Sequence, residues 1–150
     1  MKYYRELKAT YDIEKWTEKC EQIINKIRKP EMRGGHDAAN TIAGIFIEEH
    51  YYDRLLTLLK LNASRIVFVD KYAKNLQDKF SKEILELYEN SINEYAKDTG
   101  RGIYNDIARY LKKMQKIKDG QPLVNKMIAG FRDKYRVRKA MIAVLDQNFK

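Results

Sequence analysis

The segment Ile13–Ile27 reads IEKWTEKCEQIINKI, and apolar side chains recur along it at steps of three and four residues. This spacing places one apolar stripe along an α-helix, because a helix completes a turn every 3.6 residues. A second stripe with the same spacing runs from Ile66 to Phe80. The members of the two stripes are Ile13, Trp16, Cys20, Ile23 and Ile27, and Ile66, Val69, Ala73, Leu76 and Phe80. Together the stripes predict an all-α protein.

The composition favours the same fold class. The chain has 150 residues with only seven Gly and two Pro, which are fewer turn-forming residues than an all-β chain of this length needs. With 44% apolar residues it can bury a core, and we expect a single domain over residues 1–150. The longest apolar run, Ile42–Ile47, is far shorter than the roughly 20 residues of a membrane-spanning helix. No secretory signal can be read at the N-terminus, so we expect a cytoplasmic protein without membrane contact.

Apolar spacing and capping residues predict eight or nine short helices. We expect Asp12 and Ser81 to cap helices, and Asn62 to end one in a left-handed conformation. Tyr3, Tyr4 and Leu7 should point inward from the first helix. The expected helices cover about residues 2–9, 12–30 (stopped by Pro30), 38–49, 52–61, 64–79, 81–98 and 103–117, with two more beginning near residues 122 and 137.

Short connectors between these helices predict an irregular array of antiparallel helical hairpins, with a single compact bundle as the alternative. His50-Tyr51 is expected to form a tight turn. The segment Pro30–His36, which includes Arg33-Gly34-Gly35, is expected to be a connector.

Several segments resemble the C-terminal helical region of bacterial SWIM zinc-finger proteins, and the resemblance covers nearly the whole chain. They are Thr10–Trp16 (TYDIEKW), Leu55–Lys60 (LLTLLK), Tyr72–Leu76 (YAKNL), Phe80–Tyr88 (FSKEILELY), Tyr104–Met114 (YNDIARYLKKM) and Phe131–Ala140 (FRDKYRVRKA). The resemblance implies tetratricopeptide-like hairpins in a right-handed α–α superhelix, and a non-enzymatic interaction scaffold that serves as an accessory domain of a larger protein. The zinc signature of that family, C-x-C followed by C-x-H, is absent, because the chain has one Cys.

The residues favour neither a metal site nor a catalytic centre. Cys20, His36 and His50 lack the spacing of structural zinc ligands, so we expect no metal and no cofactor. The cluster Glu48-Glu49-His50 is interpreted as a solvated helix end, and no nucleophile motif is present. We therefore expect no catalytic residues and no enzyme activity.

Charge is distributed unevenly along the chain. Residues 1–98 carry 17 Lys+Arg and 17 Asp+Glu, whereas residues 99–150 carry 13 and 4, so the net charge of +9 belongs to the last third. The candidate binding residues for an acidic partner or a nucleic acid are Arg109, Lys112, Lys113, Lys116, Lys118, Arg132, Lys134, Arg136, Arg138 and Lys139. The first four repeat at helical spacing and predict one basic stripe.

The partner itself stays open at this point. An unknown protein, or a flanking domain of a larger chain, is the first hypothesis. A nucleic acid bound by the basic last third is the second, although no nucleic-acid-binding motif is present. An array cut from a longer chain leaves an apolar end that a second copy can cover, so a homodimer is a further alternative. Four tyrosines are interpreted as packing residues rather than base-stacking platforms: Tyr88, Tyr95, Tyr104 and Tyr110.

Overall fold

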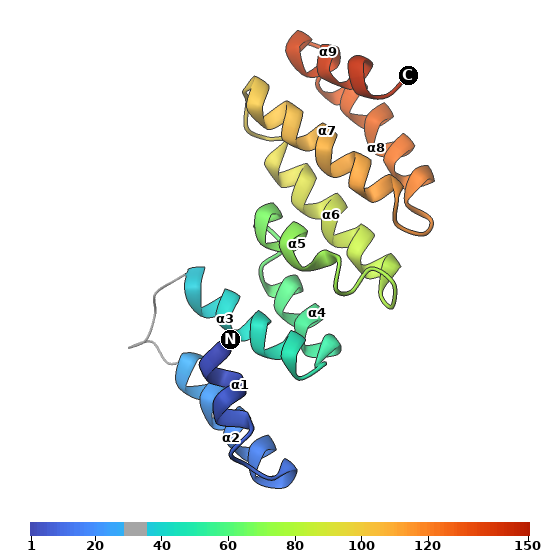
Figure 1. Cartoon of the computed structure of the whole chain (residues 1–150). Helices are drawn as coiled ribbons and strands as arrows, with labels where there is room; N and C mark the ends of the chain where they lie inside the picture. The colour runs from blue at the N-terminus through green and yellow to red at the C-terminus, as the bar shows by residue number, and fades with distance from the viewer. Residues whose placement is uncertain (29–35) are drawn as a thin grey trace. The chain divides into compact units, whose positions relative to one another are not determined.

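The computed structural model describes residues 1–28 and 36–150, and all regular structure in these ranges is α-helical (Figure 1). The prediction of an all-α chain is therefore confirmed for the described residues, and their nine helices agree with the eight or nine expected. The predicted connector lies outside the described residues, apart from His36, which begins a helix. The chain forms two compact units, residues Met1–Leu58 and Leu59–Lys150.

The N-terminal unit contains α1 (Lys2–Lys8), α2 (Ile13–Arg28), α3 (His36–Glu48) and most of α4 (Tyr52–Leu61). Helix α2 packs against α3. Asp12 caps α2 as predicted, since its Oδ1 accepts a hydrogen bond from the backbone N–H of Lys15 at 2.9 Å.

The apolar stripe of α2 differs from the prediction at its ends. Ile13 is 87% exposed, so its assignment to the buried stripe is wrong. The buried side chains are instead Trp16, Cys20 and Ile24, which repeat every four residues. Ile13 is the first residue of α2, nearly one turn before Trp16, so it lies beyond the buried part of this face.

Helix α1 buries none of its residues. Tyr3 and Leu7 are exposed, so the prediction that they point inward is wrong. The inward face of α1 is polar, because Tyr4, Arg5 and Lys8 make its contacts with the rest of the unit.

The turn between α3 and α4 forms at His50-Tyr51 as predicted. His50 adopts a φ of 57°, a conformation in which glycine is more common, and the Tyr51 N–H donates to the Phe46 carbonyl at 2.7 Å. The expectation of a left-handed Asn62 is wrong. In the described part of the chain, His50 and Asp119 are the non-glycine residues with positive φ.

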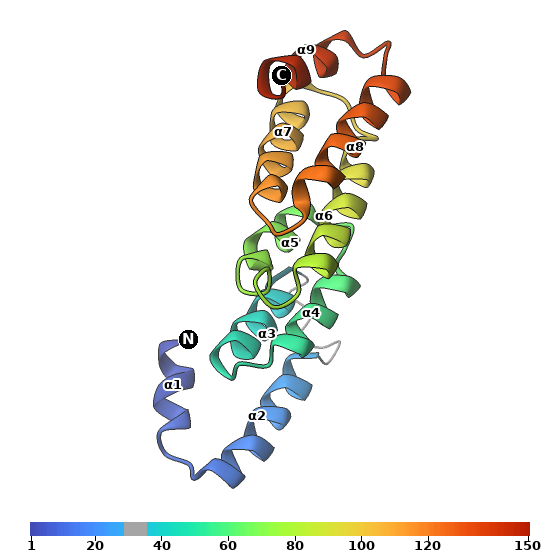
Figure 2. The ribbon, with the colours of Figure 1, turned by 90° about the vertical axis from the view of Figure 1, so that its right-hand side faces the viewer.

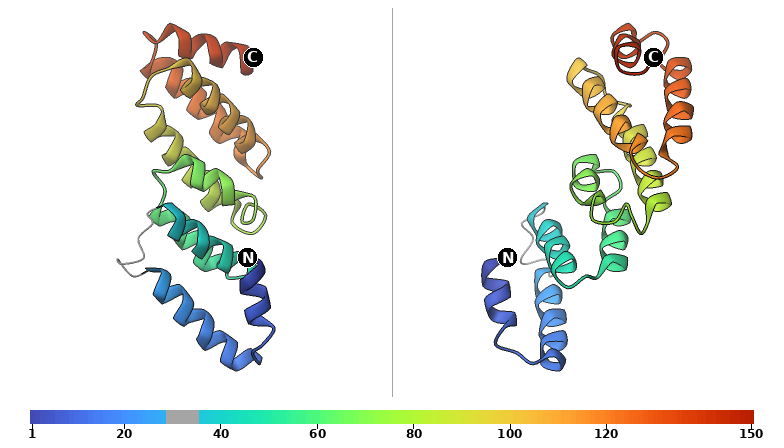
Figure 3. Two further views of the ribbon diagram at one scale, coloured as in Figure 1. Left: turned by 60° about the vertical axis from the view of Figure 1, so that its left-hand side comes forward. Right: turned by 45° about the vertical axis from the view of Figure 1, so that its right-hand side comes forward.

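The C-terminal unit contains α5 (Ile66–Ala73), α6 (Ser81–Tyr95), α7 (Arg101–Gln115), α8 (Gly120–Lys134) and α9 (Lys139–Asn148). Consecutive helices from α5 to α8 pack in pairs as helical hairpins, and α9 packs against α7 (Figures 2 and 3). The fully buried side chains that hold them include Leu76, Ile84, Ile92, Ile107, Leu111, Met114 and Met141. Apolar burial of this kind is the main stabilising term in such a unit.

Two predicted details of this unit are wrong. Helix α5 ends at Ala73 rather than near Lys79, because residues 74–79 continue as hydrogen-bonded turns. Those turns keep Leu76 buried, so apolar spacing alone does not distinguish them from helix. Ser81 is the first residue of α6 and not its cap; Phe80 holds the cap position without a side-chain hydrogen bond.

The turn from α7 to α8 closes tightly at Gly120. A Cβ atom at this position would lie 1.8 Å from the carbonyl oxygen of Met114, so only glycine fits. The preceding Asp119 has a φ of 62°, which reverses the chain within a few residues.

Candidate functional site

The predicted basic stripe lies on the exposed face of α7. Arg109, Lys112, Lys113 and Lys116 line one hollow of about 410 Å3 in the C-terminal unit. Two side-chain amides complete its lining, Asn105 from α7 and Asn148 from the end of α9. We call this set of four cations and two amides the basic face. The hollow thus gathers four positive charges with no carboxylate in its lining.

Two of these cations also reach carboxylates beside the hollow. Arg109 donates to Asp106 one turn earlier at 2.9 Å, and Lys113 donates to both oxygens of Asp70 at 2.6 and 2.7 Å. Lys112 donates to the side-chain oxygen of Asn148 at 2.7 Å. For Lys116, no salt bridge is found among the described residues. The charges of Lys112 and Lys116 are therefore less neutralised than those of Arg109 and Lys113.

Asp70 is a site residue that the sequence analysis missed. It lies on α5, 43 residues before Lys113, and it also accepts a hydrogen bond from the Tyr88 hydroxyl at 2.7 Å. Burial raises the pKa of Tyr88, and the hydrogen bond to Asp70 raises it further. Asp70 joins α5, α6 and α7 at the edge of the basic face, and no local motif signals this.

The remaining basic candidates do not join the basic face. Lys118 lines a different hollow of about 550 Å3 beside Leu85 and Leu123. Arg132 pairs with Asp146 at 2.8 Å, and Lys134 lies 5.2 Å from the centre of the Tyr135 ring. Two further cations are exposed, Arg136 and Lys139.

Arg138 has a structural role that its sequence position does not reveal. Its guanidinium donates to three backbone carbonyls just after the last residue of α6, at 2.7 to 3.3 Å. The same group lies 4.3 Å from the centre of the Tyr135 ring. The accepting carbonyls are those of Ala96, Lys97 and Asp98. Arg138 thus satisfies the carbonyl of the C-cap residue Ala96 and two carbonyls of the turn that follows.

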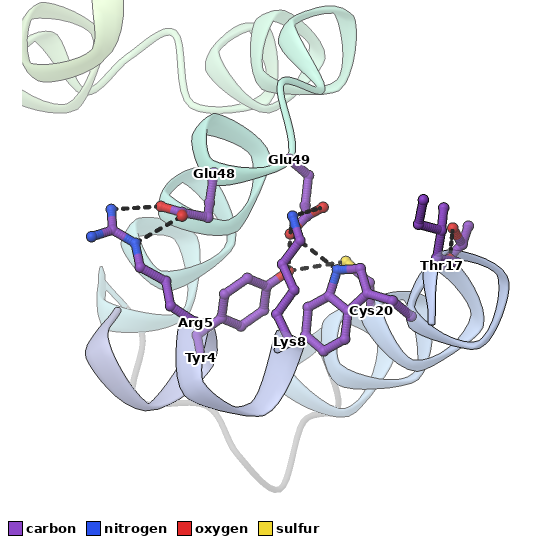
Figure 4. A network of polar contacts seen from close by, with 9 residues as sticks. Tyr4, Arg5, Lys8, Thr17, Cys20, Glu48 and Glu49 are labelled. Atoms are coloured by element: carbon purple, nitrogen blue, oxygen red, sulfur yellow. Dashed lines mark hydrogen bonds and ion pairs between the residues drawn. The ribbon is translucent and has the colours of Figure 1, made fainter. Parts of the chain in front are cut away.

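The N-terminal unit holds a polar cluster around Glu49 (Figure 4). The Glu49 side chain is only 7% exposed, although it lies in the segment that the sequence predicted to be a solvated helix end. Its oxygens accept hydrogen bonds from the Tyr4 hydroxyl at 2.9 Å, from the Lys8 ammonium at 2.9 and 3.0 Å, and from the Trp16 indole at 3.2 Å. The solvated interpretation is therefore wrong for Glu49.

Neighbouring contacts extend the cluster. Arg5 donates to both oxygens of Glu48 at 2.7 and 2.8 Å, which lowers the pKa of that carboxyl. The Tyr4 hydroxyl lies 3.3 Å from the Cys20 sulfur, and burial raises the pKa of both groups. His50 is exposed, and its Nδ1 lies 3.0 Å from the Tyr52 hydroxyl, outside the Glu49 cluster.

Chemically, the two clusters differ in what they offer a ligand. The basic face presents charge in an open hollow, whereas most donors of the Glu49 cluster are already engaged within the unit. Among the described residues, no three His, Cys, Asp or Glu side chains come together as metal ligands do. No described helix combines the length and the apolar character that crossing a membrane requires.

Comparison with protein-family models, with curated proteins and with solved structures finds no match to this chain.

Proposed function

We propose that the chain is a non-enzymatic interaction scaffold and that its C-terminal unit binds an acidic segment of a partner protein on the basic face. The observation that supports this proposal is the hollow in which Arg109, Lys112, Lys113 and Lys116 meet. Four cations held on one helix face attract an anionic partner and speed its association.

Carboxylates are the favoured ligand, because two carboxylates of the same unit already pair with cations of the basic face. Asp70 and Asp106 lie 2.6 to 2.9 Å from the nitrogens of Lys113 and Arg109. These contacts show the geometry in which a carboxylate satisfies an ammonium or guanidinium group. Carboxylates of a partner would occupy the equivalent positions at Lys112 and Lys116.

The test is a charge reversal that leaves the internal ion pairs intact. The double variant Lys112→Glu/Lys116→Glu should weaken binding of a labelled polyglutamate peptide by tenfold or more, measured by fluorescence anisotropy at low salt, on the order of 1.4 kcal/mol per tenfold. Lys74→Glu/Lys126→Glu changes the net charge equally at exposed positions outside the hollow and should retain binding. Equal loss of peptide binding in both variants would show that only the net charge matters, and this result would refute the proposal.

A nucleic acid is the second candidate, and the charge of residues 99–150 favours it: 13 Lys+Arg against 4 Asp+Glu. Phosphate-backbone binding would weaken steeply between about 50 and 200 mM salt, because neutralised phosphates release counterions. Labelled single- and double-stranded DNA and RNA, titrated under both conditions, test this. Tight, salt-sensitive binding that the double variant abolishes would favour the nucleic acid over the acidic protein.

We also propose that the scaffold is a cytoplasmic accessory domain of a larger protein of the SWIM zinc-finger type. The support for this is the sequence resemblance across the predicted helices, together with the helical hairpins of the C-terminal unit. The sequence of the larger protein tests this proposal: a segment next to this one should carry the C-x-C and C-x-H zinc ligands that this chain lacks.

A further inference from the structure

The N-terminal unit contains a second hollow, of about 330 Å3, with aromatic walls. Tyr11 and Trp16 contribute rings whose centres lie 6.0 Å apart at an angle of 54°, so the rings meet at a corner rather than stack. Tyr51 adds a third ring, and the Glu49 carboxylate completes this side of the lining. Aromatic rings and a carboxylate together make a lining that suits a cation.

An ammonium group of the chain itself already lies at this hollow. The Lys8 nitrogen is 6.0 Å from the centre of the Trp16 ring and 2.9 and 3.0 Å from the two Glu49 oxygens. Lys8 extends from α1, which buries none of its residues, and its side chain is 40% exposed. Its position marks where a cation is stabilised, and moving it would break the ion pair with Glu49 rather than apolar packing.

We propose that this hollow is a binding site for a methylated ammonium group, which enters by displacing Lys8. A trimethylammonium group is weakly hydrated and carries methyl groups that pack on aromatic rings, so it gains more from an aromatic lining than a primary ammonium does. Glu49 supplies the opposite charge without needing an N–H donor from the ligand. The ligand is a small quaternary amine or a trimethylated lysine side chain; both carry the same group.

Trp16 provides the readout, because it is the only Trp in the chain and lines the hollow. Its fluorescence is followed during titration with choline and, separately, with 3,3-dimethyl-1-butanol, which has the same shape without the charge. Lys8→Met removes the competing ammonium, and choline affinity should rise about tenfold. Lys2→Met makes the same change on the exposed side of α1 and should leave the affinity unchanged.

Tyr11→Ala, introduced into the Lys8→Met protein, tests the aromatic wall. Tyr11 is exposed, so the substitution should preserve the fold, which far-UV circular dichroism checks. Choline binding should weaken several-fold. The proposal is overturned if choline and its neutral analogue bind equally, if Lys8→Met leaves choline affinity unchanged, or if Tyr11→Ala does.

A peptide carrying trimethyllysine distinguishes the two sources of the ligand. Tighter binding of the peptide than of choline supports a protein ligand, and tighter binding of choline supports a small metabolite. Binding of neither, in the Lys8→Met protein, overturns the site. The basic face is not involved in any of these measurements, so this inference stands or falls independently of the proposed function.

Discussion

Different forces hold helices α1 and α7 in place. Helix α7 buries Tyr104, Ile107, Ala108, Tyr110, Leu111 and Met114. Helix α1 buries no residue and relies on hydrogen bonds and ion pairs to Glu48, Glu49 and Cys20. Apolar packing is insensitive to pH, whereas polar contacts of this kind depend on charge state and solvent. The two helices should therefore respond to different perturbations.

The largest effect is expected from a substitution that creates a cavity in the C-terminal unit. Leu111→Ala removes a side chain that is 0% exposed, and it should lower the free energy of unfolding by about 3 kcal/mol. Urea unfolding followed by circular dichroism measures the loss. Val67→Ala truncates a side chain that is 71% exposed on α5 and should have little effect. Equal effects of the two changes would contradict apolar packing as the dominant force.

A neutral substitution at Glu49 tests the N-terminal unit. Glu49→Gln keeps the size of the side chain but removes the charge that three donors share, so it should cost about 1–2 kcal/mol. Trp16 fluorescence during urea unfolding reports on this unit. Glu48→Gln, at a side chain exposed to 23%, is the matched control and should cost less. The reverse order would show that the buried Glu49 contacts stabilise the unit less than the Arg5–Glu48 pair does.

Removing the hydrogen bonds of Arg138 in the C-terminal unit should have a smaller effect. Arg138→Met removes the group that donates to three backbone carbonyls just after α6, and it should lower the free energy of unfolding by about 1 kcal/mol. Arg136→Met, two residues earlier and exposed, serves as its control. If both variants unfold at the same denaturant concentration, the carbonyl contacts contribute nothing measurable.

Of the changes considered, acid should have the smallest effect on the stability of the N-terminal unit. Hydrogen bonds from Arg54 and Arg5 lower the pKa values of Glu21 and Glu48 below the ordinary 4.5. Their stabilisation is fully present above pH 4.5 and is lost as the pH falls through the lowered values. Thermal unfolding followed by Trp16 fluorescence should show a decrease in Tm below that pH. Arg54→Met should flatten this dependence, and an unchanged profile would remove the Arg54–Glu21 pair as its cause.

The sequence predicted the helices well and the polar contacts poorly. Ile107, Leu111, Met114 and Ile117 lie at helical spacing, and all four are buried as expected. Spacing of this kind depends on near neighbours, so a single sequence carries it.

Glu49 shows the opposite case. Its partners Tyr4 and Trp16 are 45 and 33 residues away, and nothing in the local sequence marks their convergence. The four cations of the basic face were predictable because one helix carries them all. Asp70 contacts Lys113 from another helix. Like the partners of Glu49, it is distant in sequence, so it could not be predicted.

Gly120 has a consequence for how this chain can vary. Any side chain at that position collides with the Met114 carbonyl, so a saturation library should retain a single amino acid there. The surface cations nearby carry no such restriction, and substitutions at Lys118 should be tolerated freely. In a set of related chains, the α7–α8 turn would then appear as one invariant column in a divergent surface, and it would align distant relatives more reliably than the charges do.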